Sequence, residues 1–320
     1  MAELKKRMDD TMWIADRWKD YEVLDTAGGE KLERWGAYQL VRPDPQVIWD
    51  TGKKLPGWKK PNAHYHRSQK GGGEWEFFDL PEQWNISYEL SAASSGSKAS
   101  EAQASGKRIA FHLKPFAFKH TGVFPEQAVN WDFSASLISE RLRKAGTAPR
   151  VLNLFAYTGG ATLAALSAGA SVTHVDASKG MVSWAKENAV LSGLSDAPVR
   201  WLVDDCTKFV EREIRRGRSY DAIIMDPPSY GRGPKGEIWK IEDSIYPFIE
   251  LCTQLISDTP LFVLINSYTT GLQPAVLRYM LSLAFQKRFG GSAEAEEIGL
   301  PVTESGLTLP CGASGRWIAE

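Results

Sequence analysis

The sequence predicts an α/β fold in which a mostly parallel sheet ends in an antiparallel hairpin and follows a small β-rich domain. From residue 151 onward, short apolar runs alternate with segments of helical period, and repeated β-α units build parallel sheets. Residues 293–299 and 307–318 are typical of two strands with no helix between them, which predicts the hairpin. Seven of the twelve tryptophans lie before residue 91, among short alternating stretches that indicate half-buried strands.

The composition predicts a cytoplasmic protein with no metal site and no membrane span. Its 320 residues carry a net charge of −1, so a polyanion would need a local basic patch. The three cysteines are widely spaced, which argues against a disulfide framework or a metal site. The N-terminus lacks the apolar core of a signal peptide, and no apolar run approaches the roughly 18 residues of a membrane helix. The sequence leaves the oligomeric state undecided.

Residues 1–118 are expected to form the small β-rich domain, and residues 119–320 the larger domain. Alternating stretches such as 84–90, bounded by proline and glycine, indicate its strands. Residues 91–107 are almost all Ser, Ala, Gly and Lys, and this composition predicts a mobile loop because it cannot bury apolar surface. Since residues 109–113 resume a strand pattern, the loop is expected to join two strands of a hairpin.

The larger domain is expected to contain five strand–helix units. The strands are placed at residues 151–155, 172–176, 199–203, 221–225 and 260–265. The helices are placed at residues 160–168, 179–192, 205–216, 242–257 and 273–287. In a parallel sheet the carboxyl ends of the strands line one edge, and ligands bind at that edge. The polar residues at these strand ends are therefore the candidate functional residues.

A glycine pair, Gly159-Gly160, follows the first strand within the segment Asn153 to Thr162. Glycine permits a tight turn and a close approach of the backbone to a ligand, and the next helix offers N–H groups and a positive dipole end. An ordinary strand-to-helix turn is the alternative. The G-x-G-x-x-G pattern is absent, which argues against NAD or FAD.

Acids end the second and third strands. Asp176 can accept both hydrogen bonds of a ribose diol; alternatively, Asp176 or Ser178 caps the next helix. At Asp204-Asp205 one acceptor can take an adenine exocyclic N–H, and helix capping is again the alternative. We prefer Asp205 for this role. The strand ends therefore indicate a nucleoside-containing cofactor.

Asp226-Pro227-Pro228 ends the fourth strand and is the most specific single feature of the chain. Two prolines fix a stiff backbone, which directs the Pro227 carbonyl outward beside the Asp226 carboxylate. Two acceptors there suit an amino group or ring nitrogen on a flat base, on which Tyr230 can stack. A rigid turn without chemical function is the alternative.

A local basic-aromatic stretch in the first domain is typical of single-stranded RNA binding, through phosphate charge and base stacking. Its members are Lys53, Lys54, Lys59, Lys60, His64, His66, Arg67 and Lys70, with Trp49, Trp58 and Tyr65 between them. A solvated loop over a tryptophan-rich core is the alternative. A second basic run is typical of a helix end whose cations complement the dipole. It consists of Arg212, Arg215, Arg216 and Arg218.

The strand-end residues resemble class I S-adenosylmethionine-dependent methyltransferases, and more narrowly the branch that methylates cytosine C5 or guanine N7 in large-subunit ribosomal RNA. The matching segments are 153–160, 175–179, Asp205 and 226–232. Thr121 to Gln127 is similar to a Thr-Gly-x-Phe-x-x-Gln segment that precedes the catalytic domain in that branch. The resemblance covers about residues 108–320 and implies a Rossmann-like methyltransferase sheet.

The resemblance implies a role for each residue at a matching position. Asp176 would hold the ribose and Asp205 the adenine amine of the cofactor. Asp226 and Pro227 would face the target, with Tyr230 beside them as the third catalytic candidate. The expected contacts of S-adenosyl-L-methionine are Phe124, Gln127, Asn153, Phe155, Tyr157, Thr158, Gly159, Asp176, Ala177, Ser178, Asp204, Asp205 and Asp226.

Two departures from the branch bear on the acceptor atom. The cytosine-C5 members use cysteine nucleophiles near the fourth and fifth strand ends, whereas residues 226–229 and 266–270 contain no cysteine. Covalent attack on a pyrimidine is therefore disfavoured. Enzymes that methylate exocyclic amines usually place an aromatic residue directly after Pro-Pro, and here Ser229 precedes Tyr230.

The sequence thus predicts an S-adenosylmethionine-dependent methyltransferase that acts on a nucleobase nitrogen in RNA, with ribosomal RNA favoured. The expected RNA contacts are Lys53, Lys54, Lys59, Lys60 and Arg67. Two alternatives stay open. The near-zero charge favours a methyltransferase for a small molecule or a protein side chain, and binding alone could preserve the same residues in a catalytically silent RNA-binding relative.

Overall fold

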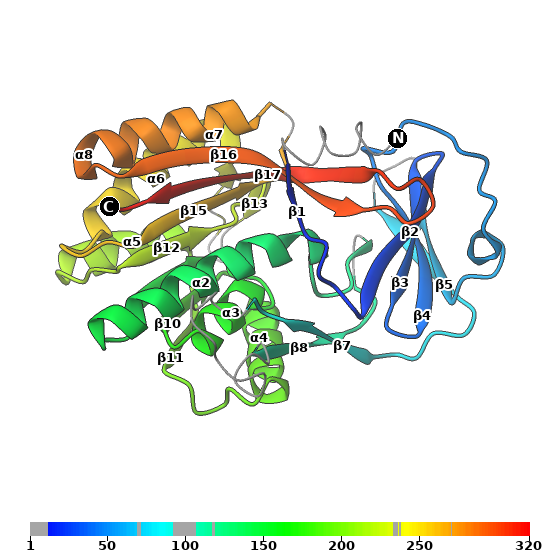
Figure 1. The fold of residues 1–320 in the computed structure, drawn as a ribbon, viewed down its shortest axis with the longest axis horizontal. Helices are drawn as coiled ribbons and strands as arrows, with labels where there is room; N and C mark the ends of the chain where they lie inside the picture. The colour runs from blue at the N-terminus through cyan, green and yellow to red at the C-terminus, as the bar shows by residue number, and fades with distance from the viewer. Residues whose placement is uncertain are drawn as a thin grey trace, which may run out of the picture. The chain divides into compact units, whose positions relative to one another are not determined.

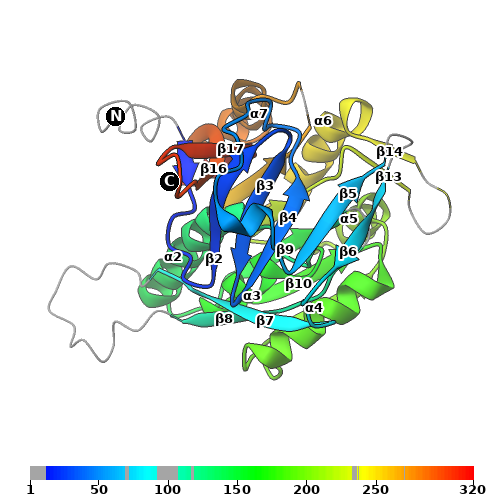
Figure 2. The same cartoon turned by 90° about the vertical axis from the view of Figure 1, so that its right-hand side faces the viewer.

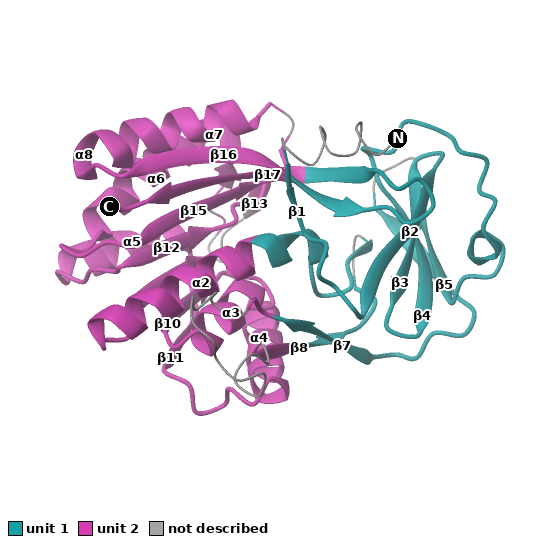
Figure 3. Ribbon diagram, viewed as in Figure 1, with its two compact units in different colours: residues 1–89, 110–129, 298–311 teal, residues 90–109, 130–297, 312–320 magenta. Residues whose placement is uncertain are grey.

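The computed structural model describes residues 12–68, 72–91, 107–116, 119–232, 236, 238–269 and 271–320. Contacts divide the chain into two compact units (Figure 3). Unit 1 comprises residues 1–89, 110–129 and 298–311, and unit 2 comprises residues 90–109, 130–297 and 312–320. The sequence prediction placed one boundary after residue 118, whereas contacts assign residues 119–129 and 298–311 to unit 1 and residues 90–109 to unit 2. The expected mobile loop at 91–107 lies, except for its two end residues, outside the described residues.

Unit 2 is built on the predicted sheet (Figure 1). Its parallel strands are β9 (Arg150–Leu154), β10 (Ser171–Asp176), β11 (Val199–Val203), β12 (Ala222–Met225) and β15 (Phe262–Ser267). The order β11-β10-β9-β12-β15 continues with β17 (Thr308–Ile318), β16 (Ser292–Pro301) and β1 (Met12–Ile14). Strand β17 runs antiparallel to β15, and Val302 N–H donates to the Leu307 carbonyl at 2.8 Å in the turn between β16 and β17. The predicted fold class is confirmed.

Helices cover both faces of this sheet. They are α2 (Ala128–Ala145), α3 (Gly160–Ser167), α4 (Lys179–Leu191), α5 (Cys206–Arg215), α6 (Ile241–Cys252) and α7 (Pro274–Leu281). On one face Phe133 of α2 packs against Phe262, with ring centroids 5.6 Å apart, and Thr162 of α3 accepts a hydrogen bond from Asn153. Because side chains alternate along a strand, the intervening residues of β9, β12 and β15 pack on the other face, against α5, α6 and α7.

Two helix ends differ from the predicted ones. Helix α6 stops at Cys252 and continues as a 3-10 turn, Thr253–Leu255, because Ile256 pairs with Tyr220 in a β-bridge. After α7 the chain forms a π-helical turn, Ser282–Gln286, and the short helix α8 (Lys287–Phe289). The apolar period extends through this irregular segment, so the sequence alone does not distinguish it from a continuous α-helix.

Unit 1 contains a five-stranded sheet in the order β2-β3-β4-β5-β6 (Figure 2). Its strands are β2 (Tyr21–Ala27), β3 (Glu30–Trp35), β4 (Tyr38–Pro43), β5 (Ala63–Arg67) and β6 (Gly73–Phe77). A separate pair, β7 (Trp84–Glu89) and β8 (Arg108–Leu113), confirms that the segment between them joins two paired strands. Unit 1 also contains two 3-10 turns, Pro56–Trp58 and Pro125–Gln127.

Within the described ranges, no group of three or more His, Cys, Asp and Glu side chains could hold a metal ion. Nor does any helix in these ranges combine the length and the apolar character needed to cross a membrane.

Candidate active site

The four predicted strand ends of unit 2 lie next to one another at the carboxyl edge of the sheet. Leu154 at the end of β9 pairs with Val175 of β10 on one side and with Met225 of β12 on the other. Asp176 in turn pairs with Val203, the last residue of β11. Strand order reverses around β9, and crevices at such a switch point bind ligands in open α/β sheets.

The loop after β9 has an unusual backbone. Phe155 and Tyr157 have φ angles of 55° and 51°, although neither is glycine. Non-glycine residues in this left-handed region cost about 1–3 kcal/mol each and cluster at functional sites. The chain then turns into α3 through Gly159, which has a φ of 88°. The loop after β9 therefore stays a candidate ligand-binding segment.

Both glycines of the pair are required by close packing as well. A Cβ on Gly159 would lie 3.0 Å from the Cβ of Ala185 in α4. A Cβ on Gly160 would lie 2.6 Å from the Trp131 ring of α2. The pair therefore combines a left-handed turn with the close seating of α3 against its neighbours.

Three buried side chains form a series of hydrogen bonds next to this loop. The Asn153 side chain donates to the Thr162 hydroxyl at 2.9 Å, and that hydroxyl lies 2.9 Å from Nδ1 of His174. Burial, with a smaller effect of Lys186, lowers the pKa of His174 to about 3, so the imidazole is neutral. Thr158 is also buried, and its carbonyl accepts from the Asn188 side chain at 2.9 Å. The Asn153 side chain thus forms its hydrogen bond inside the core of unit 2.

Asp176 links the loop after β9 to the start of α4. Its carboxylate accepts from the Tyr157 N–H and from the Ser178 N–H, each at 2.8 Å. Burial raises the pKa of Asp176, and these two bonds offset part of that effect. Ser178, not Asp176, caps α4 by accepting from the Met181 N–H at 3.4 Å. Ala177 lies between them and is exposed.

The acids after β11 have different partners. Asp205 caps α5, with one carboxylate oxygen 2.9 Å from the Lys208 N–H. Asp204 forms an ion pair with Arg212, which lies in the last turn of α5 as predicted. Helix capping is therefore real at Asp205. The cap uses one carboxylate oxygen of Asp205 and leaves the second oxygen available to a ligand.

A cavity of about 530 Å³ opens beside Asp205, between α5 and α6. Trp239 and Phe248 line it, and their rings lie 5.6 Å apart. The Phe155 ring lies 5.1 Å from that of Trp239, so the strained loop packs against the same aromatic pair. Trp239 and Phe248 were not among the residues predicted from the sequence. Trp239 belongs to β14 (Ile238–Lys240), which pairs with β13 (Tyr230–Arg232), and the sequence Gly233-Pro234-Lys235-Gly236 between them is a turn signal that could have indicated this hairpin.

The Asp226-Pro227-Pro228 segment leaves β12 beside the loop after β9. The Asp226 N–H points to the Leu154 carbonyl at 3.4 Å, which ties the two strand ends together. Pro227 is buried, whereas Tyr230 is half exposed. The Pro228 carbonyl accepts from the Trp239 indole at 2.7 Å, and the Ser229 hydroxyl bonds that of Thr269. Hydrogen bonds with Trp239 and with Thr269 thus hold the segment in place.

Not every predicted residue belongs to unit 2. Phe124 and Gln127 belong to unit 1, at the 3-10 turn before α2, so their part in cofactor binding stays a prediction. Cys206 and Cys252 are buried in α5 and α6, and burial raises the pKa of both thiols. The Cys206 thiol accepts from the Phe155 N–H at 3.3 Å, which makes it a support of the loop.

This geometry is that of a class I methyltransferase. Residues 124–292 match the family of S-adenosylmethionine-dependent methyltransferases, and because the match extends over more than half of the chain, the chain belongs to that family. The crystal structure of an S-adenosylmethionine-dependent methyltransferase from Agrobacterium tumefaciens is 33% identical, with a TM-score of 0.81. That similarity covers 94% of this chain and 91% of the other.

Two curated relatives are named ribosomal RNA large subunit methyltransferase K/L. The one from Shewanella frigidimarina is 33% identical over 134 residues, and the one from Pseudoalteromonas atlantica is 35% identical over 134 residues. Each match covers 41% of this chain but only 17% of the relative. This chain therefore corresponds to a small part of those longer proteins.

The carboxyl edge fits S-adenosylmethionine, the methyl donor of the family. The loop after β9 contains two left-handed residues, and backbone strain of this kind clusters at functional sites. Each oxygen of Asp176 accepts one backbone bond and keeps a second lone pair for a hydroxyl. The cavity beside Asp205 offers two aromatic rings next to an acceptor. A strained loop, a carboxylate with unused lone pairs and an aromatic cavity beside an acceptor are features that suit such a cofactor.

Proposed function

We propose that this chain methylates a nucleobase nitrogen in RNA, with ribosomal RNA as the favoured substrate and the cytoplasm as its place of action. The observation that carries the proposal is the position of Asp226 and Pro227, one strand away from the loop after β9. A carboxylate and a fixed peptide carbonyl there suit the N–H groups of a base. The names of the two curated relatives support RNA as the substrate class.

The cofactor-binding residues act in three groups in this proposal. Phe155, Tyr157 and Thr158 with Gly159 hold the methionine part through the backbone of the loop, and Asn153 keeps that loop in place. Asp176 accepts the ribose hydroxyls, beside Ala177 and Ser178. Asp205 uses its second oxygen for the adenine amine, while Asp204 fixes α5 through Arg212. Phe124 and Gln127, which belong to unit 1, stay cofactor contacts predicted from the sequence.

Bound S-adenosylmethionine supplies a methyl group on a sulfonium that is already activated. The chain therefore contributes mainly alignment, and Asp226 and the Pro227 carbonyl orient the acceptor nitrogen. As that nitrogen gains positive charge, the two acceptors stabilise it. Tyr230, exposed beside them, provides a surface for the base. Burial raises the pKa of the Cys206 and Cys311 thiols well above the ordinary value, which agrees with a route that uses no thiolate.

The basic-aromatic stretch of unit 1 is proposed to contact RNA through only part of its residues. Lys54, Lys59, Lys60 and Arg67 are exposed. Lys53 instead pairs with Glu30 and lies 4.7 Å over the Trp58 ring. The Trp58 and Trp49 indoles donate to Asp25 and Thr26, so both rings are anchored within the unit. Lys70 lies outside the described residues.

The difference between the exposed lysines and Lys53, which pairs with Glu30, allows a test of RNA binding by this stretch. Changing Lys54, Lys59 and Lys60 together to Gln should weaken RNA binding and flatten its salt dependence. The log-log slope should change by up to about 0.7 for each lysine that meets a phosphate in the parent. Lys53→Gln serves as the control, because Lys53 is used inside unit 1. Fluorescence anisotropy over a range of KCl concentrations measures both. Equal slopes for the parent and the triple variant would reduce the stretch to a solvated loop.

A second candidate function is methylation of a small molecule or a protein side chain, which the net charge of −1 favours. A third is RNA binding without turnover. Incubation with S-adenosylmethionine labelled at the methyl group separates the three. We expect the label in RNA nucleosides after digestion and mass spectrometry. Label in protein or in small molecules would favour the second candidate, and RNA binding without label would favour the third.

A further inference from the structure

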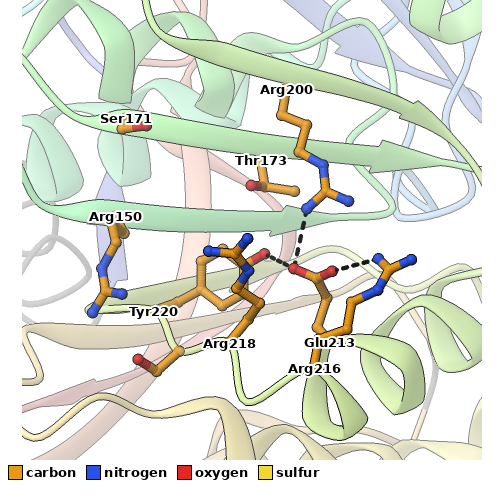
Figure 4. A pocket seen from close by; sticks show the side chains of 9 residues that line it. Arg150, Ser171, Thr173, Arg200, Glu213, Arg216, Arg218 and Tyr220 are labelled. Atoms are coloured by element: carbon orange, nitrogen blue, oxygen red, sulfur yellow. Dashed lines mark hydrogen bonds and ion pairs between the residues drawn. The ribbon is translucent and has the colours of Figure 1, made fainter.

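A second polar cavity lies at the opposite, amino edge of the same sheet (Figure 4). It has a volume of about 380 Å³. Four arginines line it: Arg150, Arg200, Arg216 and Arg218. They come from the starts of β9 and β11 and from the segment after α5, so they are far apart in the sequence. No role in methyl transfer accounts for them.

A buried glutamate organises two of these arginines. Glu213 is 1% exposed, and its carboxylate lies 3.1 Å from Arg200, 3.1 Å from Arg216 and 2.7 Å from the Tyr220 hydroxyl. Figure 4 shows the two guanidinium groups reaching Glu213 from different sides. Each guanidinium has five N–H donors, so one bond to Glu213 leaves the others available.

The side chains of the other two arginines do not pair with the Glu213 carboxylate. Arg150 lies 3.3 Å from Asp221, whose carboxylate also accepts from the Arg150 N–H and from the Ser257 hydroxyl, each at 2.7 Å. Arg218 is exposed, and its side chain forms no ion pair within the described part of the chain. Four guanidinium groups thus face two carboxylates, which leaves an excess of positive charge at the cavity.

Capping of α5 does not explain this arrangement. The dipole of α5 accounts for cations at its end, such as Arg215 and Arg216. It does not account for Arg200 and Arg150, which lie on strands. Convergence of arginines from separate elements is the usual construction of a site for phosphate, because the planar fork of guanidinium matches phosphate oxygens in a bidentate way.

We propose that this amino-edge cavity is a phosphate-binding site. The phosphate is either a backbone group of bound RNA or a free phosphate. Only the RNA source rests on the proposed function. The strands between the two edges are five or six residues long in β9, β10 and β11, which corresponds to roughly 16–20 Å. An RNA chain held at the carboxyl edge would therefore reach this cavity only by passing around the domain.

The test uses the variant Arg150→Gln/Arg218→Gln. It spares the arginines that satisfy Glu213, and Asp221 keeps its bonds to a backbone N–H and Ser257. The control Arg143→Gln/Arg215→Gln removes the same charge from exposed arginines of unit 2 that do not line the cavity. Thermal melts check folding, and Arg218→Gln alone replaces the double variant if that does not fold.

Two binding measurements on the full chain decide the question. Calorimetry with inorganic phosphate should show at least a tenfold loss of affinity in the variant and none in the control. Anisotropy with a fluorescent single-stranded RNA identifies the source. A salt-dependence slope reduced by about 0.7 for each arginine removed assigns the site to RNA backbone, and an unchanged slope assigns it to free phosphate. If the parent does not bind phosphate, or the variant binds it like the parent, the proposal is wrong. Because neither assay measures methylation, failure of the proposed function would be seen separately.

Discussion

The two edges of the sheet in unit 2 carry opposite charge, although the same strands build both. At the carboxyl edge, β10 and β12 lead into Asp176 and Asp226, and Asp176 accepts from a backbone N–H of the strained loop. At the amino edge, β9 and β11 begin with arginines that line a cavity around a single buried glutamate. The comparison indicates that one edge is built to receive hydroxyl and amine donors and the other to donate to anions.

The largest expected effect separates catalysis from cofactor binding at the carboxyl edge. Asp226 is proposed to stabilise charge that develops on the acceptor, so Asp226→Ala should reduce turnover by about 10²–10³-fold. Its affinity for S-adenosylmethionine should stay within about threefold of the parent, because one such contact is a small part of the total. Single-turnover kinetics and calorimetry measure the two quantities. A loss confined to cofactor affinity would move Asp226 out of the catalytic group.

Asp176 tests the cofactor side of the same edge. Removal of two hydrogen bonds to a charged acceptor costs about 1.5–3 kcal/mol each, so Asp176→Ala should weaken cofactor binding at least tenfold. Asp196→Ala is the control, because it removes an exposed aspartate of unit 2 that lies between α4 and β11 and is not a predicted cofactor contact. Unchanged affinity in a folded Asp176→Ala variant would remove the assignment.

The raised pKa of Asp176 adds a pH dependence. The ribose bonds need the ionised carboxylate, so cofactor affinity should fall as pH decreases through that raised pKa. The decrease should begin at a higher pH than for an ordinary aspartate. Asp176→Asn should bind more weakly and lack this part of the pH profile. A profile that the parent and Asp176→Asn share would assign the titration to another group.

At the amino edge the expected effect is on stability. Burial alone would raise the pKa of Glu213, but bonds from Tyr220, Arg216 and Arg200 lower it. Its stabilisation is therefore present above the ordinary glutamate pKa and is lost as pH falls through the lowered value. Glu213→Gln should reduce the free energy of unfolding by about 1–3 kcal/mol at neutral pH, because the partners lose a charged acceptor. Cofactor affinity should not change, and a parallel decrease in it would show that the two edges are coupled.

The smallest expected effect concerns the cysteines. The combined change Cys206→Ser, Cys252→Ala and Cys311→Ala should keep methyl transfer within about tenfold if the protein folds, since catalysis by alignment needs no thiolate. Rate measurements on RNA check this. A covalent adduct of the parent with RNA that contains 5-fluorocytosine would restore a carbon acceptor and a cysteine nucleophile.

The sequence predicted the carboxyl edge better than the amino edge for a physical reason. Acids and glycines that follow apolar runs fall at strand ends, and parallel strands bring their carboxyl ends together, so Asp176 and Asp226 could be identified one strand at a time. The positive φ angles of Phe155 and Tyr157 have no comparable signal, because they arise from the packing of the folded loop. Trp239 and Phe248 depend on contacts between α6 and a short hairpin.

No linear pattern in the sequence predicts the arginine cavity. Arg216 and Arg218 suggested only a helix end, and Arg150 and Arg200 stand singly at strand starts. Their convergence requires the strand order β11-β10-β9, which the sequence does not encode in any one segment. The same limit applies to unit 1, where residues 298–311 join a unit that begins almost three hundred residues earlier.

The central claim is that the carboxyl edge transfers a methyl group to a nitrogen of an RNA base. The most direct test incubates the parent and Asp226→Ala with RNA and S-adenosylmethionine that carries a deuterated methyl group. Mass spectrometry of the digested nucleosides then locates the label. We expect a labelled nucleoside with the methyl group on a ring or exocyclic nitrogen, formed about 10²–10³-fold more slowly by the variant. Label on a carbon atom, or equal rates for the two proteins, would contradict it.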